Sequence, residues 1–241
     1  MSRWPSGYGL ITLAQVDSTL AEARRRLPEI SGPTWILAQE QTAGRGRRGR
    51  AWVQPAGNFS ATLVLPSPGA PDQAALRSFV TALALSDVLL ALGLDPALKW
   101  PNDVLLERRK LAGILLEGLP GGALAIGIGV NLVAAPGIDQ VEPGAVEPIA
   151  LKPSGVEITA EDFLGRLADA FARREGQFAT YGFGPIRDAW LARAVRLGEE
   201  ITVRLPQETL VGTFKDVDAQ GQLVLSTPQG VRRITAGDVF F

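Results

Sequence analysis

The sequence predicts an α+β fold with a mixed, mostly antiparallel sheet, followed by a small all-β domain. Strand-like and helix-like segments alternate as far as residue 195, and short connections such as the Leu119-Pro-Gly-Gly122 turn are typical of hairpins. After Arg196 the helical pattern stops, and short strand-like segments follow one another between Gly, Asp and Pro turns, as in a small barrel. We therefore predict a large domain over residues 1–195 and a small one over residues 196–241.

The individual elements follow from periodicity and from turn and cap signals. In the large domain, strands are expected where apolar residues run continuously or alternate with polar ones, at residues 35–38, 59–65, 97–100, 111–117 and 123–130. In the small domain, they are expected at residues 201–205, 210–214, 223–225, 231–234 and 239–241. Helices are expected from Ser18 or Thr19, over 74–92 before Gly93, from Thr159, and from Pro185 to about residue 195. Residues 136–153 hold four prolines and are expected to form a surface loop.

Composition narrows the chemistry that the chain can perform. It holds 24 Lys and Arg against 25 Asp and Glu, and this near-neutral charge argues against a dedicated DNA-binding protein. It has no cysteine and no histidine, which excludes thiolate metal sites and Ser-His-Asp or Cys-His catalysis. The richest apolar stretch, residues 74–92, contains Arg77 and Asp87 and is expected to be a buried helix rather than a membrane span. No secretion signal opens the sequence, so a cytoplasmic location is expected.

The segment Gly44–Arg50 is the most informative one, with four arginines and three glycines in seven residues, and Trp52 follows it. Glycine lets a backbone come close to a ligand, and arginine presents donors that suit a phosphate or a carboxylate. The pattern also satisfies G-x-G-x-x-G. A dinucleotide-binding fold, however, needs a helix here and an acidic residue about 20 positions later, and none lies between Glu40 and Asp72. A solvated basic loop is the ordinary alternative, but the interleaved glycines favour a site for a compact anion.

A second group of charges lies at residues 99–103 and 110–113, which read Lys-Trp-Pro-Asn-Asp and Lys-Leu-Ala-Gly. Two lysines and a carboxylate suit phosphate chemistry, but they equally suit exposed strand ends and a turn cap. Asn131, just after Ile126-Gly-Ile-Gly-Val130, can bind a ligand or satisfy backbone groups at a strand end. Taken alone, these residues leave both interpretations open.

Together the motifs resemble those of the biotin–protein ligases in order and spacing. The matching segments are Asp17-Ser-Thr19, Gln41 with Gly44–Arg50, Lys99–Asp103, Lys110–Ile114 and Gly127–Asn131. The resemblance covers about residues 10–135, and the strand-rich C-terminus is similar to the small terminal domain of that family. One departure is Leu20, where the family usually has Asn, and this puts one polar contact to the substrate in doubt.

The resemblance implies a fold related to class II aminoacyl-tRNA synthetases, with an SH3-like C-terminal barrel. It implies the short form without the N-terminal DNA-binding domain that some members carry, because the first motif is reached by residue 17. The implied activity is that of an ATP-dependent ligase that forms a C–N bond. Biotin and Mg-ATP give biotinyl-5′-AMP, and biotin then passes to a lysine of a biotin carboxyl carrier protein, an acetyl-CoA carboxylase subunit. The residue chemistry agrees, because adenylation needs neither Cys nor His but does need a dense cationic site.

The resemblance also assigns roles to residues at the matching positions. The expected catalytic residues are Arg45, Arg47, Lys99, Asp103 and Lys110. Biotin is expected to contact Ser18, Thr19, Gln41, Arg45, Gly46, Arg47, Trp100, Lys110, Gly113 and Leu115. ATP is expected to contact Arg47, Arg50, Trp52, Lys99, Asn102, Asp103, Lys110 and Asn131, with Trp52 at the adenine. Asp103 is expected to serve either Mg²⁺ or the acceptor lysine.

Two other functions stay open on the sequence. One is a lipoate–protein ligase-like adenylating transferase, which shares the fold and the adenylation logic, and the other is a catalytically silent biotin-binding module. The arginine loop and residues 99–103 favour biotin over lipoate, and the presence of Lys99, Asp103 and Lys110 favours an enzyme. No DNA partner and no membrane partner are expected, and a homodimer fits as well as a monomer.

Overall fold

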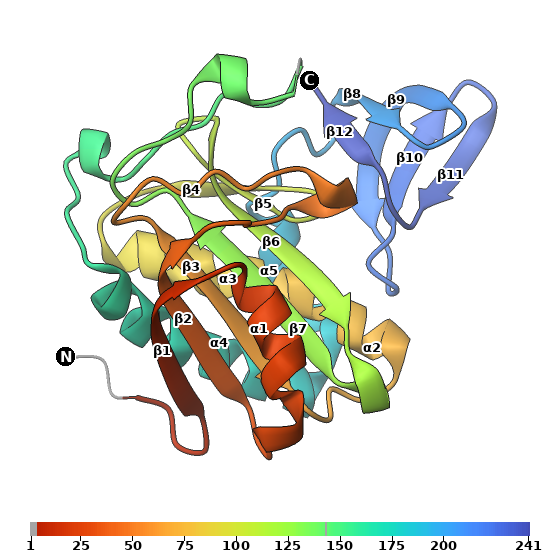
Figure 1. Ribbon diagram of the computed structural model, residues 1–241. Coiled ribbons are helices and arrows are strands. Elements are labelled where there is room, and N and C mark those ends of the chain that lie inside the picture. The colour runs from red at the N-terminus through yellow and green to blue at the C-terminus, as the bar shows by residue number, and fades with distance from the viewer. Residues whose placement is uncertain (1–3, 143) are drawn as a thin grey trace.

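The computed structural model describes residues 4–142 and 144–241, which form two sheets and the helices that pack on them (Figure 1). Within these residues the large sheet has seven strands in the order β1-β2-β3-β7-β6-β5-β4. Its strands are β1 (Gly9–Val16), β2 (Thr34–Gln41), β3 (Phe59–Leu65), β4 (Pro96–Lys99), β5 (Asp103–Leu106), β6 (Arg109–Gly118) and β7 (Leu124–Val130). Across the described ranges β1 and β2 run parallel and the other neighbours antiparallel, which confirms the predicted mixed, mostly antiparallel sheet.

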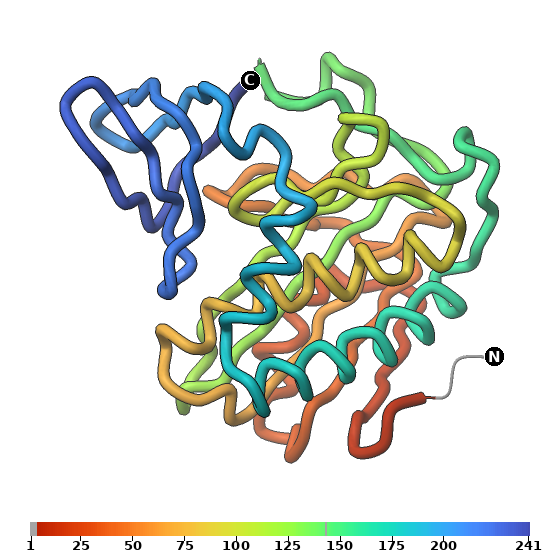
Figure 2. The backbone as a smooth tube through the Cα atoms, turned by 180° about the vertical axis from the view of Figure 1, so that it is seen from behind, coloured from red at the N-terminus to blue at the C-terminus, as the bar shows by residue number. Residues whose placement is uncertain are grey.

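The helices cover the two faces of this sheet unequally. They are α1 (Thr19–Arg26), α2 (Pro71–Ala75), α3 (Arg77–Ala91), α4 (Ala160–Tyr181) and α5 (Phe183–Leu191). Figure 2 shows α3, α4 and α5 packed side by side over one face, while α1 lies on the other face against β2, β3 and β7. Helix α4 starts as predicted, because the Thr159 hydroxyl accepts a hydrogen bond from the backbone N–H of Asp162 at 3.1 Å. Helices α3, α4 and α5 leave the α1 face of the sheet uncovered, and this face has room for a binding site.

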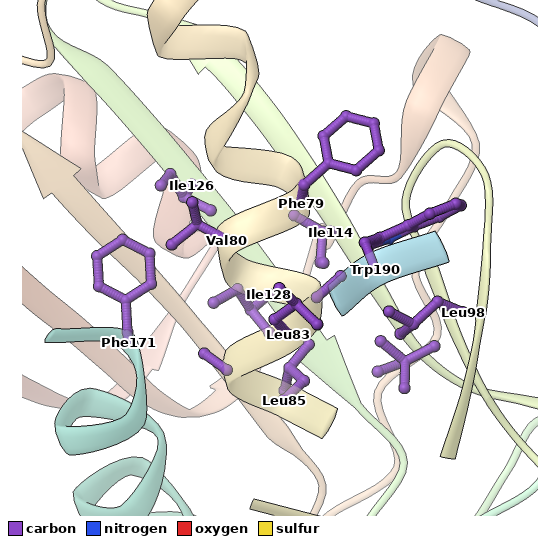
Figure 3. Packing of buried hydrophobic residues seen from close by; sticks show 14 of the residues in the cluster. Phe79, Val80, Leu83, Leu85, Leu98, Ile114, Ile126, Ile128, Phe171 and Trp190 are labelled. Atoms are coloured by element: carbon purple, nitrogen blue, oxygen red, sulfur yellow. The ribbon is translucent and has the colours of Figure 1, made fainter. Parts of the chain in front are cut away.

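The main core lies between the sheet and the three helices that share a face. Val80 and Leu83 of α3 lie beside Ile126 and Ile128 of β7, whereas the Phe79 ring points away from them toward Trp190 (Figure 3). The Phe79 ring meets the Trp190 ring of α5, with centroids 5.2 Å apart at 71°. Edge-to-face pairs of this kind add to the free energy gained by burying the rings. The core therefore fixes the sheet on which the site is built.

The two charges of the apolar helix α3 pair with α4. Arg77 Nη2 lies 2.7 Å from Glu175 Oε1, and Arg174 Nε lies 2.7 Å from Asp87 Oδ2. The stretch Pro71–Ala91 has the length and apolar composition of a membrane-spanning helix, but most of it is buried inside the protein. The prediction of a buried helix is confirmed, and its charges tie it to its neighbour.

The C-terminal residues form a second, antiparallel sheet. Its described strands are β8 (Glu200–Arg204), β9 (Thr209–Val217), β10 (Leu223–Thr227), β11 (Gly230–Ile234) and β12 (Asp238–Phe240), in the order β11-β10-β9-β8-β12. The sheet curls on itself as an SH3-like barrel and packs against the large domain near α3 (Figure 1). Trp100 Nε1 donates a hydrogen bond to the carbonyl of Gly221 at 3.1 Å across this contact. The predicted boundary at residue 196 falls between α5 and β8 and stays a prediction.

Three elements differ from the sequence prediction. β1 was not expected, because it is an edge strand with a largely exposed face and lacks a continuous apolar run. β5 was not expected either, because its four residues follow directly on the Lys-Trp-Pro-Asn segment. The segment 136–153 is more than a surface loop. Ile149–Leu151 is buried, and the backbone of Lys110 is hydrogen-bonded to Glu147 and Ile149.

Helix α3 offers a direct test of this core. Leu83→Ala should lower the free energy of unfolding by about 2–5 kcal/mol, because Leu83 is fully buried and its loss leaves a cavity. The control is Leu90→Ala on the same helix, where the side chain is 38% exposed and a change of less than about 1 kcal/mol is expected. Urea unfolding monitored by circular dichroism measures both, and equal losses would contradict the packing described.

Candidate functional site

The floor of the site is a row of residues in register across the sheet. Reading from β2 to β4, the row is Ala38, Ser60, Gly129, Gly113, Asp103 and Lys99, each paired with the next. Because directly opposite residues of antiparallel strands share a face, all six point toward the α1 side. Adjacent strands lie about 4.8 Å apart, so the stretch from Ser60 to Asp103 spans roughly 14 Å. This length suits an elongated ligand with different groups at its two ends.

A cavity of about 620 Å³ lies over this row. Every residue predicted for the site lines it, from Ser18 at the end near α1 to Lys99 at the end near β4. These residues extend from Ser18 to Asn131 in the sequence, and the fold brings them together around one cavity. Their individual roles stay predictions.

Hydroxyl and amide groups form the polar end of the cavity. The Thr62 hydroxyl donates to Thr19 Oγ1 at 2.9 Å, and the Thr19 hydroxyl donates to Gln41 Oε1 at 3.1 Å. The backbone N–H of Thr19 donates to the same Gln41 oxygen at 2.8 Å. Because its carbonyl oxygen is occupied twice, Gln41 presents its amide NH₂ as a donor. Thr62 was not predicted, and its position facing the site in β3 is the signal that sequence reasoning passed over.

A carboxylate between two lysines forms the other end. Lys110 Nζ lies 2.7 Å from Asp103 Oδ1, and Lys99 Nζ lies 3.8 Å from Asp103 Oδ2. Burial raises the pKa of the Asp103 carboxyl, but Lys110 and Lys99 outweigh it and hold that pKa below its ordinary value. Burial also lowers the pKa of Lys99, against the opposing pull of Asp103. At neutral pH Asp103 is therefore ionised, and the Nζ atoms of Lys99 and Lys110 lie on either side of its carboxylate.

The arginine loop is tied to the C-terminal barrel, a contact that the sequence did not reveal. Arg48 and Arg50 each donate to Asp238 Oδ2 of β12, at 2.8 and 2.9 Å. Arg47 donates to the carbonyl of Gly237 at 3.1 Å, and Arg50 also pairs with Glu142 at 2.7 Å. No motif marks Asp238 or Glu142 in the sequence, and only the fold brings them to the loop.

The charges around the cavity do not cancel. Among the described residues, five cationic side chains and three carboxylates line it, so a formal excess of two positive charges remains. The cations are Arg45, Arg47, Arg50, Lys99 and Lys110, and the carboxylates are Asp103, Glu142 and Asp238. A cavity walled by protein strengthens the attraction of such a surplus for an anion. The predicted compact-anion site is consistent with this charge balance.

Two glycines make the middle of the floor flat, and the indole of Trp52 lies on it. A Cβ placed on Gly129 would overlap the Trp52 ring at Cε2, and one on Gly113 would be 3.4 Å from Trp52 Cζ3. Gly113 and Gly129 are opposite one another on β6 and β7, so one ring covers both. Trp52 thus stands midway between the polar and charged ends, and its predicted contact with adenine stays a prediction.

Leu20 and the two asparagines complete the lining. Leu20, at the position where Asn was expected, is buried and packs on Gly127, whose added Cβ would lie 2.8 Å from Leu20 Cδ1. Asn102 Nδ2 donates to the carbonyl of Ile114 at 2.6 Å. Asn131 Nδ2 donates to the carbonyl of Ile149 at 3.1 Å, while its buried Oδ1 has no partner among residues 4–142 and 144–241. Asn131 therefore combines a strand-end role with a free acceptor.

The arrangement has a definite chemical capacity. Donors and acceptors at the polar end can orient a neutral head group, and the cavity beside the Trp52 indole can accept an apolar body. The cationic end can hold a carboxylate and a phosphate together and stabilise the negative charge that develops between them. Such a site suits the activation of an elongated carboxylic acid by a nucleotide.

Comparison with known proteins agrees with this geometry. Residues 12–132 match the Biotin/lipoate A/B protein ligase family, and residues 197–241 match the Biotin protein ligase C terminal domain. The chain is 52% identical over 238 residues to a Biotin--[acetyl-CoA-carboxylase] ligase of Paracoccus denitrificans, covering 95% of this chain and 99% of that protein. A ligase of the same name from Mycobacterium tuberculosis is 33% identical, covering 95% of this chain and 88% of that one. The biotin protein ligase of Aquifex aeolicus in complex with biotin and ATP superposes with a TM-score of 0.81 at 26% identity, covering 96% and 97% of the two chains.

The link between the arginine loop and the barrel can be tested by Asp238→Asn. The variant keeps the size of the side chain but removes the charge that Arg48 and Arg50 share. We expect a loss of about 1.5–3 kcal/mol in the free energy of unfolding and faster amide hydrogen exchange in residues 45–50. Asp95→Asn is the control, because Asp95 is 97% exposed and 3.7 Å from Arg193. Unchanged exchange in the loop would show that Asp238 does not hold it.

Proposed function

Because the chain belongs to the biotin/lipoate A/B protein ligase family, we propose that it is an ATP-dependent biotin–protein ligase. The substrates are biotin, ATP and a lysine of a biotin carboxyl carrier protein, and the bond formed is an amide C–N bond. The main support for the proposal is the row of residues in register across the sheet. The Thr19–Gln41 pair lies beside one end of this row, and the Lys99–Asp103–Lys110 group lies at the other. The relatives named for biotin–[acetyl-CoA-carboxylase] ligation support the choice of substrate.

In the first step, the biotin carboxylate attacks the α-phosphate of ATP and displaces pyrophosphate, giving biotinyl-5′-AMP. Both reactants are anions, so their approach needs positive charge that is already in place. Arg45, Arg47 and Lys110 line the cavity and supply such charge. The ureido head would lie at Thr19 and Gln41, where the Gln41 amide can donate to its carbonyl.

In the second step, the carrier lysine attacks the acyl carbon and AMP leaves. An unperturbed lysine has a pKa of about 10.4, so roughly 0.1% or less is the free amine at neutral pH. Asp103 is the carboxylate placed to receive the incoming ammonium. Because the pKa of Asp103 is held below its ordinary value, its carboxylate is a weak base and a poor proton acceptor. Its part is to hold and orient the ammonium while the proton passes to solvent, and Lys99 and Lys110 stabilise the departing phosphate.

Mg²⁺ belongs to the proposal as the ion that accompanies ATP. The described residues contain no cluster of three or more His, Cys, Asp or Glu side chains that could hold a metal. Asp103 is one of the carboxylates that line the cavity, and Asn131 also lines it, with a buried Oδ1 that has no partner in the described part of the chain. Mg²⁺ usually keeps several waters and uses one or two protein oxygens with substrate phosphates, so this set fits it. The ion would neutralise phosphate charge when bound.

The proposal places the activity in the cytoplasm, where ATP is available. It needs neither a nucleic acid nor a membrane, and it works for a monomer and for a homodimer alike. The acceptor would be a biotin carboxyl carrier domain of acetyl-CoA carboxylase, as the names of the relatives indicate.

A single incubation tests the function. The protein, biotin, Mg-ATP and a carrier domain are mixed, and mass spectrometry should find one biotinyl increment on one carrier lysine. A carrier with that lysine changed to arginine should gain nothing. Lipoate in place of biotin should give little or no product. A carrier that is lipoylated in preference, or that stays unmodified, would refute the proposal.

Asp103→Asn separates the two roles considered for Asp103. We expect the variant to bind biotin but to lose carrier biotinylation by about 10²-fold, because the incoming ammonium loses the carboxylate that holds and orients it. Purified biotinyl-5′-AMP then bypasses the first step, with Asp95→Asn as the control. Transfer from the supplied intermediate should remain slow. Transfer at the wild-type rate would instead mean that Asp103 serves the Mg²⁺ of the first step.

A further inference from the structure

The hydroxyl of Ser60 is a buried polar group that no contact within the described part of the fold satisfies. Ser60 is only 2% exposed, and its Oγ has no hydrogen-bond partner among the residues that the structure describes. A buried hydroxyl usually finds a partner, because leaving it unpaired costs the free energy of removing it from water. Ser60 also lines the cavity. A ligand that enters the cavity is therefore a natural partner for this hydroxyl.

The place of Ser60 on the floor shows which part of a ligand it can meet. Ser60 lies two residues from Thr62 on β3, and so points to the same face at a distance of roughly 6.6–6.8 Å along the strand. Thr62 belongs to the polar end, where it donates to Thr19. Across the sheet Ser60 is paired with Gly129, on which the Trp52 indole lies. Ser60 thus stands between the polar end and the charged end, beside the flat middle.

The chemistry of the substrate identifies the partner, and this step rests on the function proposed above. With its ureido group at Thr19 and its carboxylate near Lys110, biotin places its fused ring between the two ends, beside Ser60. The ring carries one further polar atom there, the thioether sulfur, which is a weak hydrogen-bond acceptor. We propose that Ser60 is a specificity-determining residue whose hydroxyl donates a hydrogen bond to this sulfur.

A serine that binds the substrate differs from a purely structural serine in how its replacement affects the empty and the biotin-bound protein. In the unliganded protein, Ser60→Ala removes an unpaired buried hydroxyl, and should raise the thermal midpoint by about 2 °C or more. With biotin bound, the same change removes a partner of the substrate and should weaken binding. The variant is therefore more stable when empty and gains less stability from biotin, and these two effects have opposite signs.

A matched control exists in the chain. Ser86, in the middle of α3, is fully buried, and its hydroxyl likewise has no partner within the described ranges. It does not line the cavity. Ser86→Ala should raise the thermal midpoint in the same way and leave biotin binding unchanged.

The experiment compares the wild type, S60A and S86A by calorimetric titration with biotin and with desthiobiotin, which keeps the ureido ring and the acid chain but lacks the sulfur. Thermal unfolding without ligand is measured in parallel. S60A should lose about two- to fivefold in affinity for biotin, which corresponds to the lower part of the range for one hydrogen bond, and less than twofold for desthiobiotin. S86A should lose neither.

Each other result overturns the inference. An equal loss for both ligands would place the hydroxyl at the ureido group, and no loss for either would remove Ser60 from the site. A lowered thermal midpoint of empty S60A would show that the hydroxyl has a partner in the protein. Failure of the wild type to bind biotin would instead refute the proposed function, so the two failures are distinguishable.

Discussion

The gathering of positive charge in one cavity is the constraint on which the rest of the site depends. Arginines from one loop and lysines from two strands repel one another, and they can share a site only where carboxylates stand between them. Asp103 is such a carboxylate inside the sheet, where it pairs with Lys99 and Lys110. Asp238 is such a carboxylate in the barrel, where it pairs with Arg48 and Arg50. The barrel is thus part of the binding site and not an appendage. The remaining positive surplus is the basis for binding a nucleotide and an acid together, since the carboxylates do not use all of the charge that the site presents.

The register of the strands fixes the order in which the polar and charged groups lie along the site. The row from Ser60 to Lys99 places a hydroxyl, two glycines, a carboxylate and a lysine in sequence across neighbouring strands. A shift of one residue in any pair would turn those side chains to the other face, so the packing that fixes the register also fixes the chemistry. Helices α3, α4 and α5 fix it from behind, where their core is continuous with the sheet. Helix α1 lies on the opposite face of the sheet and supplies Thr19 to the polar end.

Much of this arrangement could be predicted from local patterns, and the rest depends on contacts between distant segments. The strand at Phe59–Leu65 and the cap at Thr159 were predicted correctly because an apolar run and a capping residue are local signals. The lining positions were predicted because their motifs keep a recognisable order. Asp238, Glu142 and Ser60 were missed, since each is ordinary in its own segment and becomes significant only through residues far away in the chain. β1 was missed for a related reason, because an exposed edge strand carries little periodic signal.

A crystal structure of the protein with biotinyl-5′-AMP would show whether the positive charge of the cavity holds the reaction intermediate. The phosphate of the intermediate should lie within hydrogen-bond distance of Lys99 or Lys110 and of at least one arginine of the loop. The ureido group should contact Thr19 and Gln41, with the ring beside Ser60. A phosphate bound elsewhere, with the Lys99–Asp103–Lys110 group and the Asp238–arginine contacts facing only solvent, would contradict the account.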